Sequence, residues 1–292
     1  MQTISSRPSD GSPVFQIGRY RCPADRCLVM GILNITPDSF SNGGEHFDHQ
    51  TAIEAAQQMV ADGVDLIDIG GESTRPGADP VSITEECERV LPVIQALQGL
   101  GVPLSLDSRR AEVVQQAMAI GIDLVNDVDG FRSPEMRQLV PQIIEQGLMV
   151  CVMHMQGEPQ TMQVDPHYDD VVGEVYGFLA SQRERLMAMG LEQTQILLDP
   201  GFGFGKTLAH NQALFTAIAD YAGDMPLLIG VSRKRMIGQL SDRGEDRAAD
   251  RLGGSLAAAV MAAQAGARIV RVHDVRQTVD ALRVSRAFSV NH

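Results

Sequence analysis

The sequence predicts one α/β domain, a single (β/α)₈ barrel in which eight parallel strands are enclosed by helices. Its 292 residues suit the roughly 250 that such a barrel needs, with some to spare. Eight short aliphatic runs begin at intervals of about 34 residues between positions 28 and 268, which is the length of one strand–helix unit. A doubly wound open sheet is the alternative that this pattern leaves open.

The eight expected strands are short runs of aliphatic residues without alternation of polar side chains. Runs of this kind are typical of a parallel sheet whose outer face is covered by helices. They begin near Leu28, Val64, Val102, Ile122, Leu148, Gln195, Pro226 and Arg268.

Helices are expected in the segments between these runs. Apolar residues at three- and four-residue spacing predict a helix over 51–62. A second follows Ser108 and stops at Gly121, and a third, rich in alanine, covers 251–265. The long connection 155–195 has room for a loop and one long helix, with an apolar side made of Val175, Phe178, Leu179, Leu186 and Met189.

Charge and composition exclude several classes of protein. The net charge is −13, and the longest basic run is 233–235, so a nucleic-acid-binding surface is not expected. The four cysteines lack zinc-site spacing, and no run of about 18 apolar residues could span a membrane. The N-terminus has no signal-peptide core, so we expect a cytoplasmic protein with reduced thiols. Residues 1–13 are expected to form a flexible lead-in to a domain over 14–292.

Polar residues follow every expected strand, where the barrel fold places active sites. One polar strand end is ordinary, but eight together indicate a polar pocket. These residues are Asn34, Asp68, Asp107, Asn126, Asp127, His154, Asp199, Ser232, Arg233, Lys234, Arg235, Arg271 and His273.

The chemistry of these side chains separates them into three groups. Asp107, Asn126 and Asp199 suit a heterocycle that carries N–H and amino groups. Arg75, Arg271, His273 and residues 233–235 suit a carboxylate or phosphate. Asn34 could help to hold Mg²⁺ together with a substrate phosphate.

The glycine-rich segment 199–207 is not expected to be a nucleotide phosphate loop, because that motif needs glycine where Pro200 stands. We expect a mobile or tightly turned loop that presents Phe204 as an apolar contact. No spacing supports a nucleophilic serine or cysteine, so the sequence does not predict nucleophilic hydrolysis.

Seven segments together closely resemble the dihydropteroate synthases, the folate-pathway family targeted by sulfonamides. They occur in the order of that family and cover residues 30–44, 68–78, 105–110, 153–163, 198–207, 230–238 and 271–275. The resemblance implies that dihydropterin pyrophosphate is joined to p-aminobenzoate with release of pyrophosphate. It also implies Mg²⁺ as cofactor, a homodimer, and loops at about 34–46 and 71–79 that close over the substrates.

The same resemblance implies a role for individual residues. Asp107, Asn126, Asp199 and Lys234 would bind the pterin, whereas Thr74, Arg75, Pro76, Phe204 and Ser232 would border p-aminobenzoate. Asn34 would bind Mg²⁺, and Arg271, Val272 and His273 would contact substrate, with the two charged residues on the phosphates. The catalytic set would be Asn34, Asp38, Arg75, Lys234, Arg271 and His273.

Two segments depart from the family pattern. Ser108, Arg109 and Arg110 stand where many relatives have threonine, a residue such as serine, and then lysine. Asp129 stands where serine or another residue is common. Two alternatives share the pterin pocket: a pterin-dependent methyltransferase of the corrinoid type, and a pterin-binding paralogue without turnover. Neither needs the phosphate-binding residues and the two loops, which are intact in this sequence.

Overall fold

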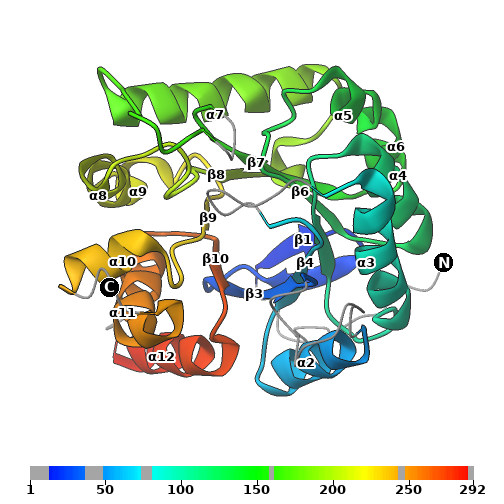
Figure 1. The fold of residues 1–292 in the computed structure, drawn as a ribbon, viewed down its shortest axis with the longest axis horizontal. Coiled ribbons are helices and arrows are strands. Elements are labelled where there is room, and N and C mark those ends of the chain that lie inside the picture. The colour runs from blue at the N-terminus through cyan, green and yellow to red at the C-terminus, as the bar shows by residue number, and fades with distance from the viewer. Residues whose placement is uncertain (1–12, 37–48, 74–80, 158–160, 243–246, 289–292) are drawn as a thin grey trace.

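Eight parallel strands form a closed barrel in the computed structural model, which describes residues 13–36, 49–73, 81–157, 161–242 and 247–288 (Figure 1). The hydrogen-bonded order is β8-β7-β6-β5-β4-β3-β10-β9, and a parallel bridge between Leu198 and Leu227 closes the ring. The strands are β3 (Leu28–Asn34), β4 (Leu66–Gly70), β5 (Leu104–Asp107), β6 (Leu124–Asp127), β7 (Met149–Met153), β8 (Ile196–Asp199), β9 (Leu228–Ile229) and β10 (Ile269–Val272).

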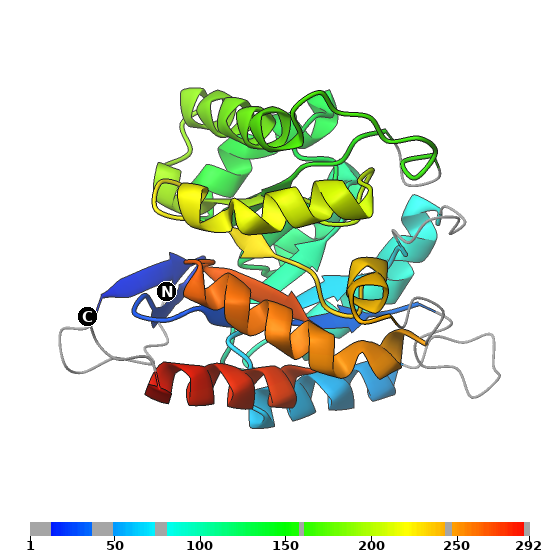
Figure 2. The same cartoon turned by 90° about the vertical axis from the view of Figure 1, so that its left-hand side faces the viewer.

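All eight strands lie in the aliphatic runs that predict them, so the predicted (β/α)₈ barrel is confirmed and the open-sheet alternative is wrong. The first and last strands of the barrel, β3 and β10, pair with each other, and helices from opposite ends of the chain, α2 and α12, accordingly lie side by side (Figure 2). The predicted lead-in over 1–13 lies outside the described residues, except for Pro13.

The helices form an outer layer around the strands. Those predicted over 51–62, before Gly121, over 251–265 and within 155–195 are α2, α4, α11 and α7. The helices are α2 (His49–Ala61), α3 (Ile83–Ala96), α4 (Ala111–Ile120), α5 (Pro134–Gln138), α6 (Val140–Glu145), α7 (Val171–Ala188), α8 (Leu208–Thr216), α9 (Ile218–Tyr221), α10 (Arg235–Leu240), α11 (Leu252–Gln264) and α12 (Val275–Phe288). Short 3₁₀ turns cover Gln193–Gln195 and Ala248–Arg251.

One residue assigned to the apolar side of α7 does not pack there. Val175, Leu179 and Leu186 are buried against the barrel, but Met189 is exposed. The helix ends at Ala188, and Met189 is its C-terminal cap, so its side chain no longer follows the helical periodicity.

A hairpin of β1 (Val14–Ile17) and β2 (Tyr20–Pro23) covers the amino-terminal end of the barrel. Ile17 and Tyr20 pack against an apolar layer inside the ring that includes Leu28, Leu66 and Leu124. Arg19 of the hairpin turn forms an ion pair with Asp123, which is buried at the start of β6. Because this end is closed by apolar packing, the opposite end is left for polar chemistry.

Within the described residues, we find no helix with the length and hydrophobicity needed to cross a lipid bilayer.

Candidate active site

A row of polar residues crosses the carboxyl ends of four neighbouring strands. Parallel pairing sets Asn34 of β3 beside Gly70 of β4, Gly70 beside Asp107 of β5, and Asp107 beside Asn126 of β6. A Cβ at Gly70 would lie 3.6 Å from Asn34 Oδ1 and 3.8 Å from a carboxylate oxygen of Asp107. The glycine therefore leaves a space between an amide oxygen and a carboxylate.

Asp68 connects this row to the strand that closes the barrel. The side chain is completely buried and accepts hydrogen bonds from Ser105 Oγ at 2.5 Å and Asn126 Nδ2 at 3.1 Å. Arg271 Nε donates to the same carboxylate at 2.6 Å, while Arg271 Nη2 donates to Asp107 at 2.6 Å. The sequence marks Asp68 only as a polar strand end, so its role as the central acceptor is found from the structure.

Burial and neighbouring charges set the protonation of these groups. Burial raises the pKa of Asp107 to about 7, although Arg271 acts in the opposite direction. Burial opposes the charge of Arg271, but Asp68 and Asp107 outweigh it and raise the guanidinium pKa above its usual value. Burial also raises the pKa of Asp199, against the effect of Lys234. The site therefore contains one carboxyl group, that of Asp107, that can exchange a proton near neutral pH.

Lys234 extends the site towards the loop that follows β8. Its Nζ donates to the carbonyl oxygen of Phe202 at 2.5 Å and lies 4.7 Å from the centre of the Phe204 ring. Burial lowers the pKa of Lys234 to about 8, and the nearby Asp199 carboxylate partly compensates. A cation, a carboxylate and an aromatic face therefore meet at this side of the pocket.

His273 and Ser232 form a pair at the ends of β10 and β9. The backbone N–H of His273 donates to Ser232 Oγ at 3.2 Å, and His273 Nδ1 lies 3.2 Å from the same oxygen. A Cβ at Gly230 would lie 3.9 Å from both Arg271 Cβ and an Asp199 oxygen, so these residues line the same part of the barrel. Val272 lies between Arg271 and His273 but packs outwards, into the layer between strands and helices, so its backbone is the part near the pocket.

The loop after β8 is tightly turned, in agreement with one of the two forms that its sequence predicts. Gly201, Gly203 and Gly205 all have positive φ, at 67°, 80° and 64°. Since only glycine adopts this conformation without steric cost, the alternating glycines set the path of the loop and the position of Phe204.

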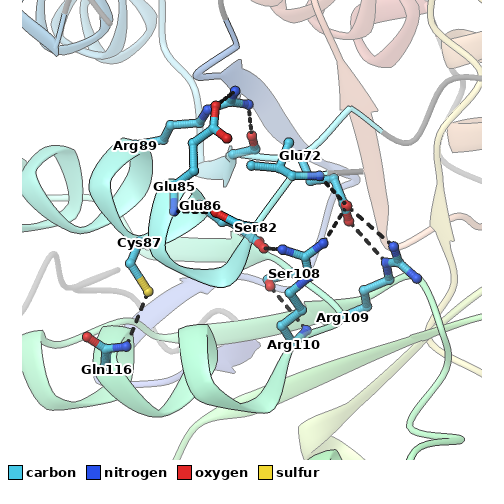
Figure 3. A network of polar contacts seen from close by, with 12 residues as sticks. Glu72, Ser82, Glu85, Glu86, Cys87, Arg89, Ser108, Arg109, Arg110 and Gln116 are labelled. Atoms are coloured by element: carbon cyan, nitrogen blue, oxygen red, sulfur yellow. Dashed lines mark hydrogen bonds and ion pairs between the residues drawn. The ribbon is translucent and has the colours of Figure 1, made fainter. Parts of the chain in front are cut away.

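A network of charged side chains holds the ends of β4 and β5 together (Figure 3). Glu72 accepts hydrogen bonds from Arg109 Nε at 3.0 Å and Arg110 Nη2 at 2.8 Å. Arg110 also forms an ion pair at 3.3 Å with Glu86, a buried residue of α3. Arg89 Nη1 donates to the carbonyl oxygen of Gly71 at 2.6 Å. The two arginines that depart from the family pattern thus fix the segment that follows Asp107.

The structure brings together nine of the site residues that the sequence predicts. They are Asn34, Asp107, Asn126, Asp199, Phe204, Ser232, Lys234, Arg271 and His273. The predictions for Asp38, Thr74, Arg75 and Pro76, and for most of the loops at 34–46 and 71–79, fall outside the described residues.

The side-chain oxygen of Asn34 is a ligand of a kind that Mg²⁺ accepts. Within the described ranges, no three His, Cys, Asp or Glu side chains are grouped in a way that could hold a metal. Mg²⁺ commonly uses one or two protein oxygens and completes its shell with substrate phosphate and water. Asn34 Oδ1, beside the space above Gly70, is a hard oxygen ligand of the required kind.

Comparisons with known proteins agree with this arrangement. Residues 30–273 match the family model described as pterin binding enzyme. A dihydropteroate synthase of Neisseria meningitidis serogroup B is 48% identical over 284 residues, covering 95% of this chain and 98% of the relative.

Two solved structures of similar proteins have the same fold. A Burkholderia cenocepacia dihydropteroate synthase complexed with 7,8-dihydropteroate gives a TM-score of 0.84 at 45% identity, covering 94% of this chain and 96% of that one. A Xanthomonas albilineans dihydropteroate synthase with 4-aminobenzoic acid gives 0.87 at 42% identity, covering 96% and 100%. With relatives this similar over nearly its whole length, the chain belongs to the dihydropteroate synthase family of pterin-binding enzymes.

Proposed function

We propose that this chain joins 6-hydroxymethyl-7,8-dihydropterin pyrophosphate to p-aminobenzoate, giving 7,8-dihydropteroate and pyrophosphate. The observation that carries the proposal is the acceptor set of Asp107, Asn126 and Asp199, of which the last two are buried, together with Arg271 on the wall beside it. Carboxylates accept hydrogen bonds from ring N–H and amino groups, and a pterin presents both. The reaction named for the similar enzymes is the one that this pocket supports best.

The residues of the pocket support a substitution in which the C–O bond breaks ahead of attack by the aniline nitrogen. The pterin itself stabilises positive charge on its methylene carbon, so no protein nucleophile is required. A guanidinium has five N–H donors, and the bonds of Arg271 to Asp68 and Asp107 use two of them. Arg271 and His273 would bind the pyrophosphate, while Mg²⁺ at Asn34, when bound, would add charge neutralisation to the leaving group.

Phe204 and Ser232 would border p-aminobenzoate, with the Lys234 ammonium above the Phe204 ring. This side of the pocket offers an aromatic face for the benzoate ring and a hydroxyl group for its polar atoms. Thr74, Arg75 and Pro76 would complete this subsite, and Asp38 the catalytic set, as the family resemblance implies.

The proposal extends to a cytoplasmic homodimer. Exposed apolar side chains occur on three helices of one side of the barrel, and a partner subunit would cover them. These are Leu240 of α10, Met261 of α11, and Val284 and Phe288 of α12. Sedimentation of the native protein should give twice the mass of one chain, and Met261→Glu should shift it towards the monomer.

The deciding experiment is pyrophosphate release from the purified protein, with dihydropterin pyrophosphate, Mg²⁺ and p-aminobenzoate each omitted in turn. The proposal expects release that depends on all three, together with formation of dihydropteroate. Tight pterin binding without release would indicate a binding paralogue, and a pterin site indifferent to pyrophosphate would favour a methyltransferase.

A further inference from the structure

Both lysines of this chain contact the same loop. Lys206 and Lys234 are the only lysines in the sequence, and the other 22 basic residues are arginines. Lys206 lies in the loop that follows β8, and Lys234 reaches the same loop from the segment after β9. Lysine is therefore found only where an ammonium group binds carbonyl oxygens of residues 201–204.

Lys206 is buried, with 3% of its surface exposed, and its ammonium group lies inside the turn of the loop. Its Nζ donates to the carbonyl oxygens of Gly201 and Phe204, both at 3.0 Å. It also lies 3.0 Å from His154 Nδ1 and 3.4 Å from the carbonyl oxygen of His154. One side chain thus joins two points of its own loop to the end of β7.

The loop packs too closely on the segment after β7 for side chains at its glycines. A Cβ at Gly201 would lie 1.9 Å from the carbonyl oxygen of His154, and a Cβ at Gly205 would lie 2.5 Å from that of Gln156. In this closely packed loop, the carbonyl oxygens of Gly201 and Phe204 both face the buried ammonium group of Lys206. Buried carbonyl groups need donors, and the cost of leaving one without a partner is about 1–3 kcal/mol.

Side chains donate to every backbone carbonyl group from residue 201 to residue 206. Lys206 donates to Gly201 and Phe204, and Lys234 donates to Phe202. Tyr168 Oη donates to Gly205 at 2.9 Å. Gln163 donates to Gly203, and Asn211 donates to Lys206. Lys206 binds two of these six carbonyl groups, including that of Phe204, whereas each of the other donors binds one of the six.

We propose that Lys206 is a positioning residue for the second substrate: its ammonium group, bound to the carbonyl oxygens of Gly201 and Phe204, sets the place of the Phe204 ring. The inference rests on the proposed function, because Phe204 borders p-aminobenzoate only if that reaction is correct. Lys206 itself is not expected to touch either substrate, because its ammonium group lies beneath the loop, against His154.

An ammonium group suits this place better than other side chains. Three donors leave a single nitrogen in different directions and can meet three acceptors, whereas a guanidinium is planar and larger. Burial and, to a lesser extent, the charge of Lys206 together lower the pKa of His154 to about 3, so the imidazole is neutral and Nδ1 can accept. Burial lowers the pKa of Lys206, and the nearby Asp199 carboxylate acts in the opposite direction.

The test compares Lys206→Met with Tyr168→Phe in steady-state kinetics for both substrates. Lys206→Met keeps the length of the side chain and removes its donors. Tyr168→Phe removes the hydroxyl group that donates to the Gly205 carbonyl of the same loop. We expect Lys206→Met to raise KM for p-aminobenzoate at least 10-fold and KM for the pterin substrate less than 3-fold. Tyr168→Phe should change both by less than 3-fold. Lys206→Gln replaces Lys206→Met if the latter does not fold.

A double-mutant cycle separates positioning from a general loss of structure. If Lys206 acts through Phe204, then Lys206→Met should have no further effect on KM for p-aminobenzoate in a Phe204→Ala protein. Additive effects, or an equal rise in both KM values, would overturn the inference. Absence of turnover by the unmutated protein would instead contradict the proposed function, so the two failures are distinct.

Discussion

Arg271 Nε lies 2.6 Å from a carboxylate oxygen of Asp68, a residue 203 positions away in the sequence. The two residues belong to β10 and β4, which are not adjacent in the sheet, because β3 lies between them. The contact therefore spans β3 and exists only once β10, the last strand of the chain, has paired with β3, the first strand of the barrel. It also means that a cation of the pocket is held by a residue beneath the substrate positions.

Asp68→Asn should lower both stability and turnover. The substitution removes one of two carboxylates from a buried guanidinium, a change that costs about 3 kcal/mol when one partner of a buried pair is lost. Arg271 would then be held by Asp107 alone. Urea unfolding and kcat/KM for dihydropteroate formation measure the two effects.

Asp65→Asn is the matched control for this prediction. Asp65 pairs with Arg26 at 2.5 Å near the amino-terminal end of the barrel, far from the strand ends that form the pocket. It should lower stability and leave kcat/KM within about 2-fold. Equal losses of turnover in the two variants would show that Asp68 acts only through stability.

Asp107 should make pterin binding depend on pH near neutrality. Burial raises its pKa to about 7 in the free protein, and the charged carboxylate is the form that accepts hydrogen bonds from a pterin. Since the carboxylate fraction grows as pH rises, affinity should increase between about pH 6 and pH 8 and then level off. Calorimetric titration with a pterin at several pH values across this range measures the affinity.

The Asp107→Asn protein provides the comparison, because an amide does not titrate in this range. Its pterin affinity should be lower at pH 8 and nearly constant from pH 6 to pH 8. A pH dependence that persists unchanged in this variant would assign the titration to another group, such as Asp199, whose pKa burial also raises.

The strands and the residues at their ends could be predicted because the signal for each lies within a few consecutive residues. An aliphatic run followed by Asp107 or Asp199 indicates a buried strand and a polar end without any knowledge of its neighbours. The β1–β2 hairpin could not be found in this way. Each of its strands has only four residues and includes a polar, exposed one. Ile17 and Tyr20 are buried only because they pack against the barrel.

The roles of Asp68 and Lys206 were hidden for a related reason. In the sequence Asp68 looks like the polar ends of the other strands, and Lys206 belongs to a loop in which only Phe204 is predicted to make a contact. What distinguishes them is contact with residues 203 and 52 positions away, across the ring and across a loop. Such contacts depend on register and closure, which no local pattern contains.

Arg109 and Arg110 should differ in their effect on stability although they are neighbours. Arg110→Ser would leave Glu86, a buried carboxyl group of α3, without its cation, at a cost of about 3 kcal/mol. Arg109→Ser would leave Glu72 paired with Arg110, and the Arg109 side chain is one-third exposed, so the cost should be under about 1 kcal/mol. Urea unfolding of the two variants checks the order, and a larger loss for Arg109→Ser would contradict it.

Gly201 and Gly147 offer a test of how closely the loop after β8 must pack. Both have φ of 67°, so alanine at either site pays the same conformational cost of about 1–2 kcal/mol. A Cβ at Gly147 would meet nothing within 4 Å, whereas one at Gly201 would lie 1.9 Å from the carbonyl oxygen of His154.

Gly147→Ala should therefore lower stability by that same cost, about 1–2 kcal/mol, and leave turnover unchanged. Gly201→Ala must push the loop away from His154, which breaks the contacts of Lys206 and displaces Phe204. We expect a larger loss of stability and a rise in KM for p-aminobenzoate, measured by thermal unfolding and steady-state kinetics. If the two alanine variants behaved alike, the position of Phe204 would not depend on the packing of this loop against β7.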